Sequence, residues 1–170
     1  GLNLRDRIKL GASGKVISAF DMMRVFALGA DWCNSARAFM FAIGCIQAQQ
    51  CHTGRCPTGV ATQDPDRQRA LVPDDKAVRV AQFHHNTLHA LAELLQAAGL
   101  EHPDQVTTNH IAQRKVDDRV ALMSETYKNI APGSLLDDKL SGRVFEVCWP
   151  MASPDSFKPL EPLPERLGQI

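Results

Sequence analysis

The stretch that decides the fold is RIKLGASGKVISAFDMMRVFALGADWCNSARAFMFAI, residues 7–43. Residues 7–13 form a short strand candidate, and Ser18 begins a helix whose apolar face ends at Gly29. A second strand and a second apolar helix follow at once, over residues 30–43. Strand, helix, strand and helix joined by tight loops are typical of a parallel α/β sheet. We therefore expect two βα units here, which need further strands because two strands cannot close a sheet.

Composition limits the classes of protein to consider. The chain has 170 residues and 44% apolar content, enough to support a core. Nineteen basic and nineteen acidic residues cancel, so no electrostatic field indicates a nucleic-acid partner. No apolar run approaches the roughly 20 residues of a membrane helix, and five cysteines without a secretory signal favour the reducing cytoplasm. The first residue is not Met, so we expect a C-terminal fragment, and a membrane anchor upstream stays open.

Two loops offer the parts of a phosphate site, which are backbone N–H groups, a helix N-terminus and a cation. They follow the two predicted strands and consist of Ser13, Gly14 and Lys15, and of Ser35, Ala36 and Arg37. In a (β/α)8 barrel, the loops after strands seven and eight share a phosphate site. The alternative is that these are two ordinary βα turns.

Three cysteines within twelve residues, Cys45, Cys51 and Cys56, form a C-x5-C-x4-C-P run. Glycines in the loop permit it to wrap a cuboidal iron–sulfur cluster, and Pro57 matches the Cys-Pro ending of bacterial ferredoxin runs. A structural zinc held by Cys45, by Cys51 or His52, and by Cys56 is weaker, because the usual C-x2-C pair is absent. A single catalytic thiolate and three buried thiols are the remaining interpretations.

The rest of the chain indicates a mostly helical extension. Helices are predicted over residues 74–98, 103–109 and 118–130. Asp117 and Asp118 would cap the last of them. From Ser134 onward an extended tail is expected, because prolines recur there at 150, 154, 159, 162 and 164. We therefore divide the chain into residues 1–65 and the extension 66–170.

The residues from Gly44-Cys45-Ile46 through Cys51-His52 and Cys56-Pro57 to Gly59-Val60-Ala61-Thr62-Gln63 resemble the glutamate synthase large-subunit family. The resemblance is strongest over residues 12–65, and the Cys-His-x3-Cys-Pro-x-Gly run within it is highly specific. The shorter, FMN-binding members that lack the glutaminase domain look most similar. The tail is only loosely similar.

This resemblance implies a fold, two cofactors and a reaction. It implies an α/β chain that ends a (β/α)8 barrel with its last two βα units, followed by a cysteine-rich loop and a helical extension. FMN phosphate would lie at Gly14–Lys15 and Ala36–Arg37, and a [3Fe-4S] cluster on Cys45, Cys51 and Cys56. The family reduces 2-iminoglutarate, formed from 2-oxoglutarate and ammonia, to L-glutamate, with electrons from a donor protein or subunit.

The chain departs from the family pattern at both phosphate loops. Where this chain has Gly14 and Lys15, the family usually has Gly-Gly. Where this chain has Ala36 and Arg37, the family usually has Gly-Thr. Cationic contacts would then replace part of the glycine N–H cradle. The alternatives are therefore an FMN oxidoreductase for another amino or oxo acid, and a non-catalytic electron-transfer or zinc-stabilised scaffold. No catalytic acid or base is assigned, and a fragment alone would be inactive.

Overall fold

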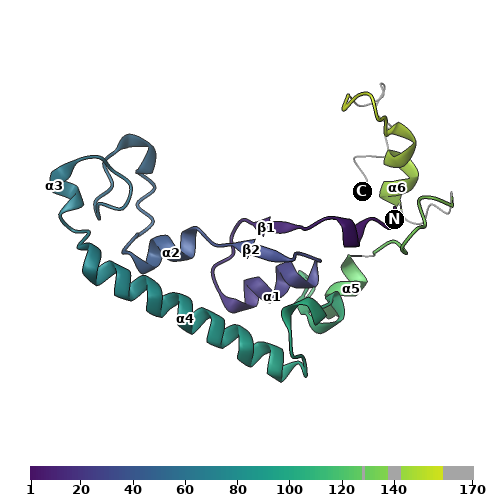
Figure 1. Ribbon diagram of the computed structural model, residues 1–170, viewed down its shortest axis with the longest axis horizontal. Helices are drawn as coiled ribbons and strands as arrows, with labels where there is room; N and C mark the ends of the chain where they lie inside the picture. Colours follow the sequence, from purple (N-terminus) through teal and green to yellow (C-terminus); the bar gives the residue numbers. More distant parts are fainter. Residues whose placement is uncertain (128, 138–142, 159–170) are drawn as a thin grey trace. The chain divides into compact units, whose positions relative to one another are not determined.

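The computed structural model describes residues 1–127, 129–137 and 143–158 (Figure 1). The chain divides into two units, one formed by residues 10–123 and the other by residues 1–9 together with the segment from 124 onward. The larger unit holds both candidate phosphate loops and all three loop cysteines. No helix in the described ranges is both long and apolar enough to cross a membrane.

The larger unit begins with the two predicted βα units. Their elements are β1 (Gly11–Ser13), α1 (Ala19–Ala27), β2 (Trp32–Asn34) and α2 (Arg37–Ala42). β1 and β2 pair in parallel, with Gly11 opposite Trp32 and Ser13 opposite Asn34. The parallel pair and both helices are confirmed. The first strand begins at Gly11 and not at Arg7, because Arg5–Arg7 form a 3-10 turn, η1.

Helix α1 is positioned by signals that are visible in the sequence. The Ser18 hydroxyl accepts a hydrogen bond from the Asp21 N–H, and the Asp21 carboxylate accepts one from the Ser18 N–H, which completes a capping box. At the other end, Gly29 has φ 99°, a backbone conformation that favours glycine. The predicted start and end of this helix are therefore confirmed.

Helix α4 (Pro73–Ala97) supports the two βα units. It packs along α1 and α2, as Figure 1 shows. The core of the larger unit is formed by α1, α4 and the segment that follows α4. Its buried members are Ala19, Met23, Ala27, Leu91, Leu95, Val106, Ile111 and Met123. Each side chain removed from water there contributes roughly 25 cal/mol per Å² of apolar surface.

The segment after α4 differs from the prediction of one helix over residues 103–109. It forms two 3-10 turns, η3 (Pro103–Gln105) and η4 (Thr108–His110). Thr107 separates them because its backbone is extended, with φ −125°, and its hydroxyl accepts a hydrogen bond from the Asn109 N–H. A residue that caps a new turn cannot continue the previous one.

The helix predicted over residues 118–130 is wrong. Its first part contains β4 (Val120–Leu122), which forms an antiparallel hairpin with β3 (Ala112–Arg114) and is followed by the short helix α5 (Met123–Thr126). Asp118 has φ 60° and occupies the turn, which the Lys115 N–H closes on the Arg119 carbonyl at 2.8 Å. Asp117 and Asp118 form ion pairs with Arg119 and Arg114 across this turn and do not cap a helix.

The smaller unit contains η1, residues 124–126 of α5 and two late elements, α6 (Arg143–Cys148) and η5 (Trp149–Met151). The Leu135 N–H donates to the Gly1 carbonyl at 3.2 Å, which joins the start of the chain to this unit. The expectation of an extended tail fails over residues 143–151. Pro159, Pro162 and Pro164 lie outside the described residues. The boundary at residue 65 stays a prediction.

Candidate functional site: two strand-end loops and a cysteine loop

The two candidate phosphate loops are neighbours. Because β1 and β2 are parallel, their carboxyl ends lie at the same edge of the sheet. The Ser35 hydroxyl donates a hydrogen bond of 2.6 Å to the carbonyl of Val16, which ties the second loop to the first. The structure therefore brings together the two segments that the sequence singled out, although binding of FMN there stays a prediction.

The first loop has an unusual backbone. Gly14 has φ 101° and Lys15 has φ 56°, and a left-handed conformation is uncommon for a residue such as lysine. Ser13, Gly14 and Lys15 are all exposed. A Cβ placed on Gly14 would meet nothing within 4 Å, so the backbone there is open to an approaching ligand.

The second loop leads into α2. Ser35 is half-buried, whereas Ala36 and Arg37 are exposed. Ala36 is the N-cap of α2, and no side chain forms a cap hydrogen bond there. The first N–H groups of this helix therefore lack a side-chain cap, and Arg37 adds a positive charge beside them.

The three cysteines occupy different environments in one loop. Cys45 follows α2, is half-buried, and its sulfur accepts a hydrogen bond from the Gln47 N–H at 3.4 Å. Cys51 is exposed and begins the 3-10 turn η2 (Cys51–Thr53). Cys56 is buried, with 7% of its surface exposed. All five cysteines of the chain are among the described residues, and each is free.

Hydrogen bonds favour the thiolate form of Cys56. A hydrogen bond from the Thr58 hydroxyl, at 3.5 Å, and backbone N–H groups beginning with that of Ala61 lower the pKa of Cys56 to about 7. The thiolate is the form that binds metal ions. By contrast, burial raises the pKa of Cys33, which is half-buried in β2.

The donor chemistry of this loop fits a thiolate-held cluster, since three free thiols lie within it. Within residues 1–127, 129–137 and 143–158, however, no three His, Cys, Asp or Glu side chains form a group that could hold a metal ion. The ligand set of Cys45, Cys51 and Cys56 therefore stays a prediction.

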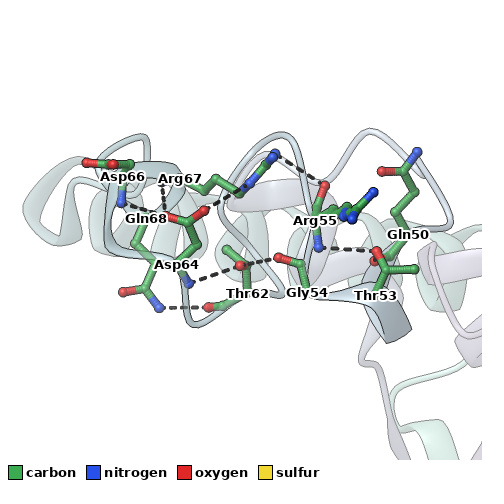
Figure 2. Close-up of polar contacts among 9 residues, drawn as sticks. All are labelled: Gln50, Thr53, Gly54, Arg55, Thr62, Asp64, Asp66, Arg67 and Gln68. Carbon is green, nitrogen blue, oxygen red and sulfur yellow. Dashed lines mark hydrogen bonds and ion pairs between the residues drawn. The ribbon is translucent and has the colours of Figure 1, made fainter.

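The sequence analysis did not predict a polar network that joins residues 62–68 to the cysteine loop. Figure 2 shows side chains from residues 62–68 bonded back to the main chain at Gly54 and Arg55, between Cys51 and Cys56. The helix α3 (Pro65–Gln68) carries part of this network. The available signal was Asp64-Pro65, because Asp at the N-cap followed by Pro is a common helix start.

The family of the chain follows from comparison with known proteins. Residues 2–101 match the family described as "Conserved region in glutamate synthase". The chain belongs to the glutamate synthase family. The matched region contains both strand-end loops and all three loop cysteines. The resemblance noted from the cysteine run is thereby confirmed at the level of the family.

Individual relatives extend this finding. The chain is 42% identical to the "Glutamate synthase large subunit-like protein YerD" of Bacillus subtilis over 114 residues, which are 67% of this chain and 22% of that protein. It is 37% identical to the "Archaeal glutamate synthase [NADPH]" of Methanocaldococcus jannaschii over 113 residues, 66% of this chain and 22% of that protein. The chain thus spans about a fifth of the length of these relatives.

Proposed function

We propose that this chain is part of an FMN- and iron–sulfur-dependent oxidoreductase that forms L-glutamate. The reaction is the reduction of 2-iminoglutarate, which arises from 2-oxoglutarate and ammonia. The observation that carries the proposal is the family match over residues 2–101, which includes the loops and the cysteines that such a reaction needs. Several relatives are named as glutamate synthases, and our proposal transfers that activity to the intact protein.

In this proposal, β1 and β2 are the last two strands of a (β/α)8 barrel. The hydrogen bond from Ser35 to the Val16 carbonyl supports it, because two adjacent strand-end loops are the parts of the barrel's phosphate site. Their N–H groups and cations would hold the phosphate of FMN, through Ser13, Gly14, Lys15, Ser35, Ala36 and Arg37. When bound, FMN supplies the hydride chemistry, and the chain supplies position and charge.

The cysteine loop would hold a [3Fe-4S] cluster, which supplies one-electron transfer to the flavin. Cys45, Cys51 and Cys56 are its proposed ligands, and the lowered pKa of Cys56 favours the thiolate that iron requires. Since the three thiols are not grouped in the described structure, we expect the loop to close when the cluster assembles.

We propose that the electrons originate from NADPH, which the names of several relatives include. An electron-donor protein or subunit would deliver them. Free cysteines and an iron–sulfur centre are also most compatible with a reducing cytoplasm.

The test uses the intact protein, purified without oxygen. We expect visible absorption from both flavin and iron–sulfur, and glutamate formation from 2-oxoglutarate, ammonia and dithionite-reduced methyl viologen. Bound flavin without glutamate formation rejects the glutamate assignment and favours another amino or oxo acid. A colourless, zinc-containing protein rejects the oxidoreductase and favours a scaffold.

A further inference from the structure

The turn before α3 is held by Asp64. One carboxylate oxygen of Asp64 accepts hydrogen bonds from the N–H groups of Asp66, at 2.9 Å, and Arg67, at 3.4 Å. Pro65 follows at the first helical position, where its fixed φ favours the helix. The other carboxylate oxygen lies 3.2 Å from the Arg67 Nε. The helix start therefore also sets the position of the Arg67 side chain.

Arg67 reaches from α3 to the cysteine loop. While its Nε bonds Asp64, its Nη1 donates to the carbonyl of Arg55 at 3.4 Å. Arg55 is the residue directly before Cys56. The planar guanidinium thus connects a carboxylate on one segment to the main chain of another, a geometry that the single amine of lysine does not reproduce.

A second connection runs through Thr62 and Gln68. The Thr62 hydroxyl donates to the carbonyl of Gly54 and accepts a hydrogen bond from the Asp64 N–H at 3.1 Å. The Gln68 side-chain amide donates to the Thr62 carbonyl at 2.7 Å. These bonds fix residue 54, in the middle of the segment between the second and third loop cysteines.

The third connection is a backbone contact. The Gly59 N–H donates to the Cys56 carbonyl at 3.3 Å, which closes a turn on the third cysteine. Gly59 is buried, and a Cβ placed on it would collide with the Arg67 carbonyl. The main chain of α3 therefore packs directly on the turn that holds Cys56.

We propose that Thr62, Asp64, Arg67 and Gln68 form a clamp that positions Cys51 and Cys56. We call these four residues the α3 clamp. They are positioning residues. Thr62 and Arg67 bond the main chain between the two cysteines, and not the sulfur atoms. Asp64 holds Arg67, and Gln68 holds Thr62. The role toward a cluster rests on the proposed function, but the hold on the loop is a property of this chain alone.

Arg69 provides a matched control on the same helix end. It forms an ion pair of 2.6 Å with Asp66 at the same i, i+3 spacing as Arg67 with Asp64. Both partners of the Arg69 pair are 80% exposed, against 40% for Arg67 and 45% for Asp64. The Arg69 guanidinium bonds Asp66 on α3, whereas the Arg67 guanidinium bonds the Arg55 carbonyl in the cysteine loop.

The first measurement follows thiol reactivity in the intact protein after removal of any metal. At fixed pH, mass-mapped alkylation of Cys51 and Cys56 is compared in the wild type, Arg67→Ala, Gln68→Ala and Arg69→Ala, with Cys33 as internal reference. We expect Arg67→Ala and Gln68→Ala to raise the Cys56 rate about threefold to tenfold, as for the loss of one hydrogen bond. Arg69→Ala should leave it unchanged. Equal rates in Arg67→Ala and Arg69→Ala overturn the proposal.

If Arg67→Ala does not fold, Asp64→Asn is the second variant. It should fold, because asparagine also caps helices well. It removes the charge that holds Arg67, so the alkylation rate of Cys56 should again rise, and a wild-type rate contradicts the clamp.

The second measurement is electron paramagnetic resonance of the protein loaded with its cluster. The cluster signal per chain should be lower in the clamp variants than in the wild type. Arg67→Lys should give a signal between that of Arg67→Ala and that of the wild type. If the wild type holds no iron, the proposed function fails, while the alkylation rates still decide the clamp.

Discussion

The Ser35 hydroxyl donates a hydrogen bond of 2.6 Å to the main-chain carbonyl of Val16. The two residues lie nineteen positions apart in sequence and follow different strands. Val16 is buried, with 3% of its surface exposed, so its carbonyl depends on this partner in place of water. One side chain therefore joins the two loops proposed to bind the flavin phosphate.

Ser35→Ala should destabilise the protein and weaken the flavin site together. Leaving a buried carbonyl without a partner costs about 1–3 kcal/mol. Urea unfolding should show this loss, and titration of flavin-free protein should show weaker FMN binding. Ser13→Ala is the control, since Ser13 is exposed and its change should not alter the free energy of unfolding. Equal unfolding midpoints for the two variants would contradict the role of the Ser35 bond.

Arg37→Ala should weaken FMN binding without changing stability. Arg37 is exposed at the first position of α2, and a charged hydrogen bond to phosphate contributes about 1.5–3 kcal/mol. Isothermal titration of flavin-free protein with FMN measures the difference. Arg79→Ala, an exposed change on α4, should keep wild-type affinity. Unchanged affinity in the Arg37 variant would remove this residue from the phosphate site.

Cys51→Ser should abolish the electron paramagnetic resonance signal of the oxidised cluster, because a hydroxyl is a poor substitute for a thiolate ligand of iron. Cys33→Ser is the control. Cys33 lies in β2, and burial raises its pKa, so it is not expected to bind iron. A wild-type signal from the Cys51 variant would exclude Cys51 from the ligand set.

The capping box of α1 should make stability depend on pH. Hydrogen bonds from the Ser18 N–H, and also from the Ile17 N–H, lower the pKa of Asp21 below its ordinary 3.8. The carboxylate is thus favoured in the folded state. Its contribution is fully present above about pH 4 and is lost as the pH falls through the lowered pKa.

Asp21→Asn tests this dependence, since it removes the charge and keeps an oxygen acceptor. At neutral pH the variant should be less stable than the wild type by about 0.3–1 kcal/mol, the usual contribution of a carboxylate near a helix N-terminus. The difference should shrink as the pH falls from 5 to 2 in a series of urea unfolding curves. A difference that does not change with pH would show that the carboxylate charge plays no part.

Local signals predicted the first third of the chain well. The capping pair Ser18 and Asp21 and the stop at Gly29 act within one helix, so the sequence alone determines them. The hairpin was missed because it depends on Asp118 adopting φ 60°, which neither composition nor periodicity reveals.

Local sequence patterns also predicted only part of the candidate functional site. Spacing identified the cysteines as donors, but it did not predict where their thiols lie relative to one another. The α3 clamp was also missed, because Arg67 and Arg55 are twelve residues apart and meet only through the path of the loop. Contacts of this kind depend on the folded main chain and not on a local pattern.

The hairpin leads directly into the core at Met123, and a substitution there tests this placement. Met123, which directly follows β4, is fully buried, with 0% of its surface exposed, and its N–H donates to the Ile111 carbonyl at 2.8 Å. Met123→Ala would leave a cavity in the core cluster to which Met23 and Leu91 also belong. Such truncations cost about 2–5 kcal/mol. Leu122→Ala, at the neighbouring position with 40% exposure, should cost much less in the same urea experiment. Equal losses would place Met123 outside the core and restore the possibility of a helix through this segment.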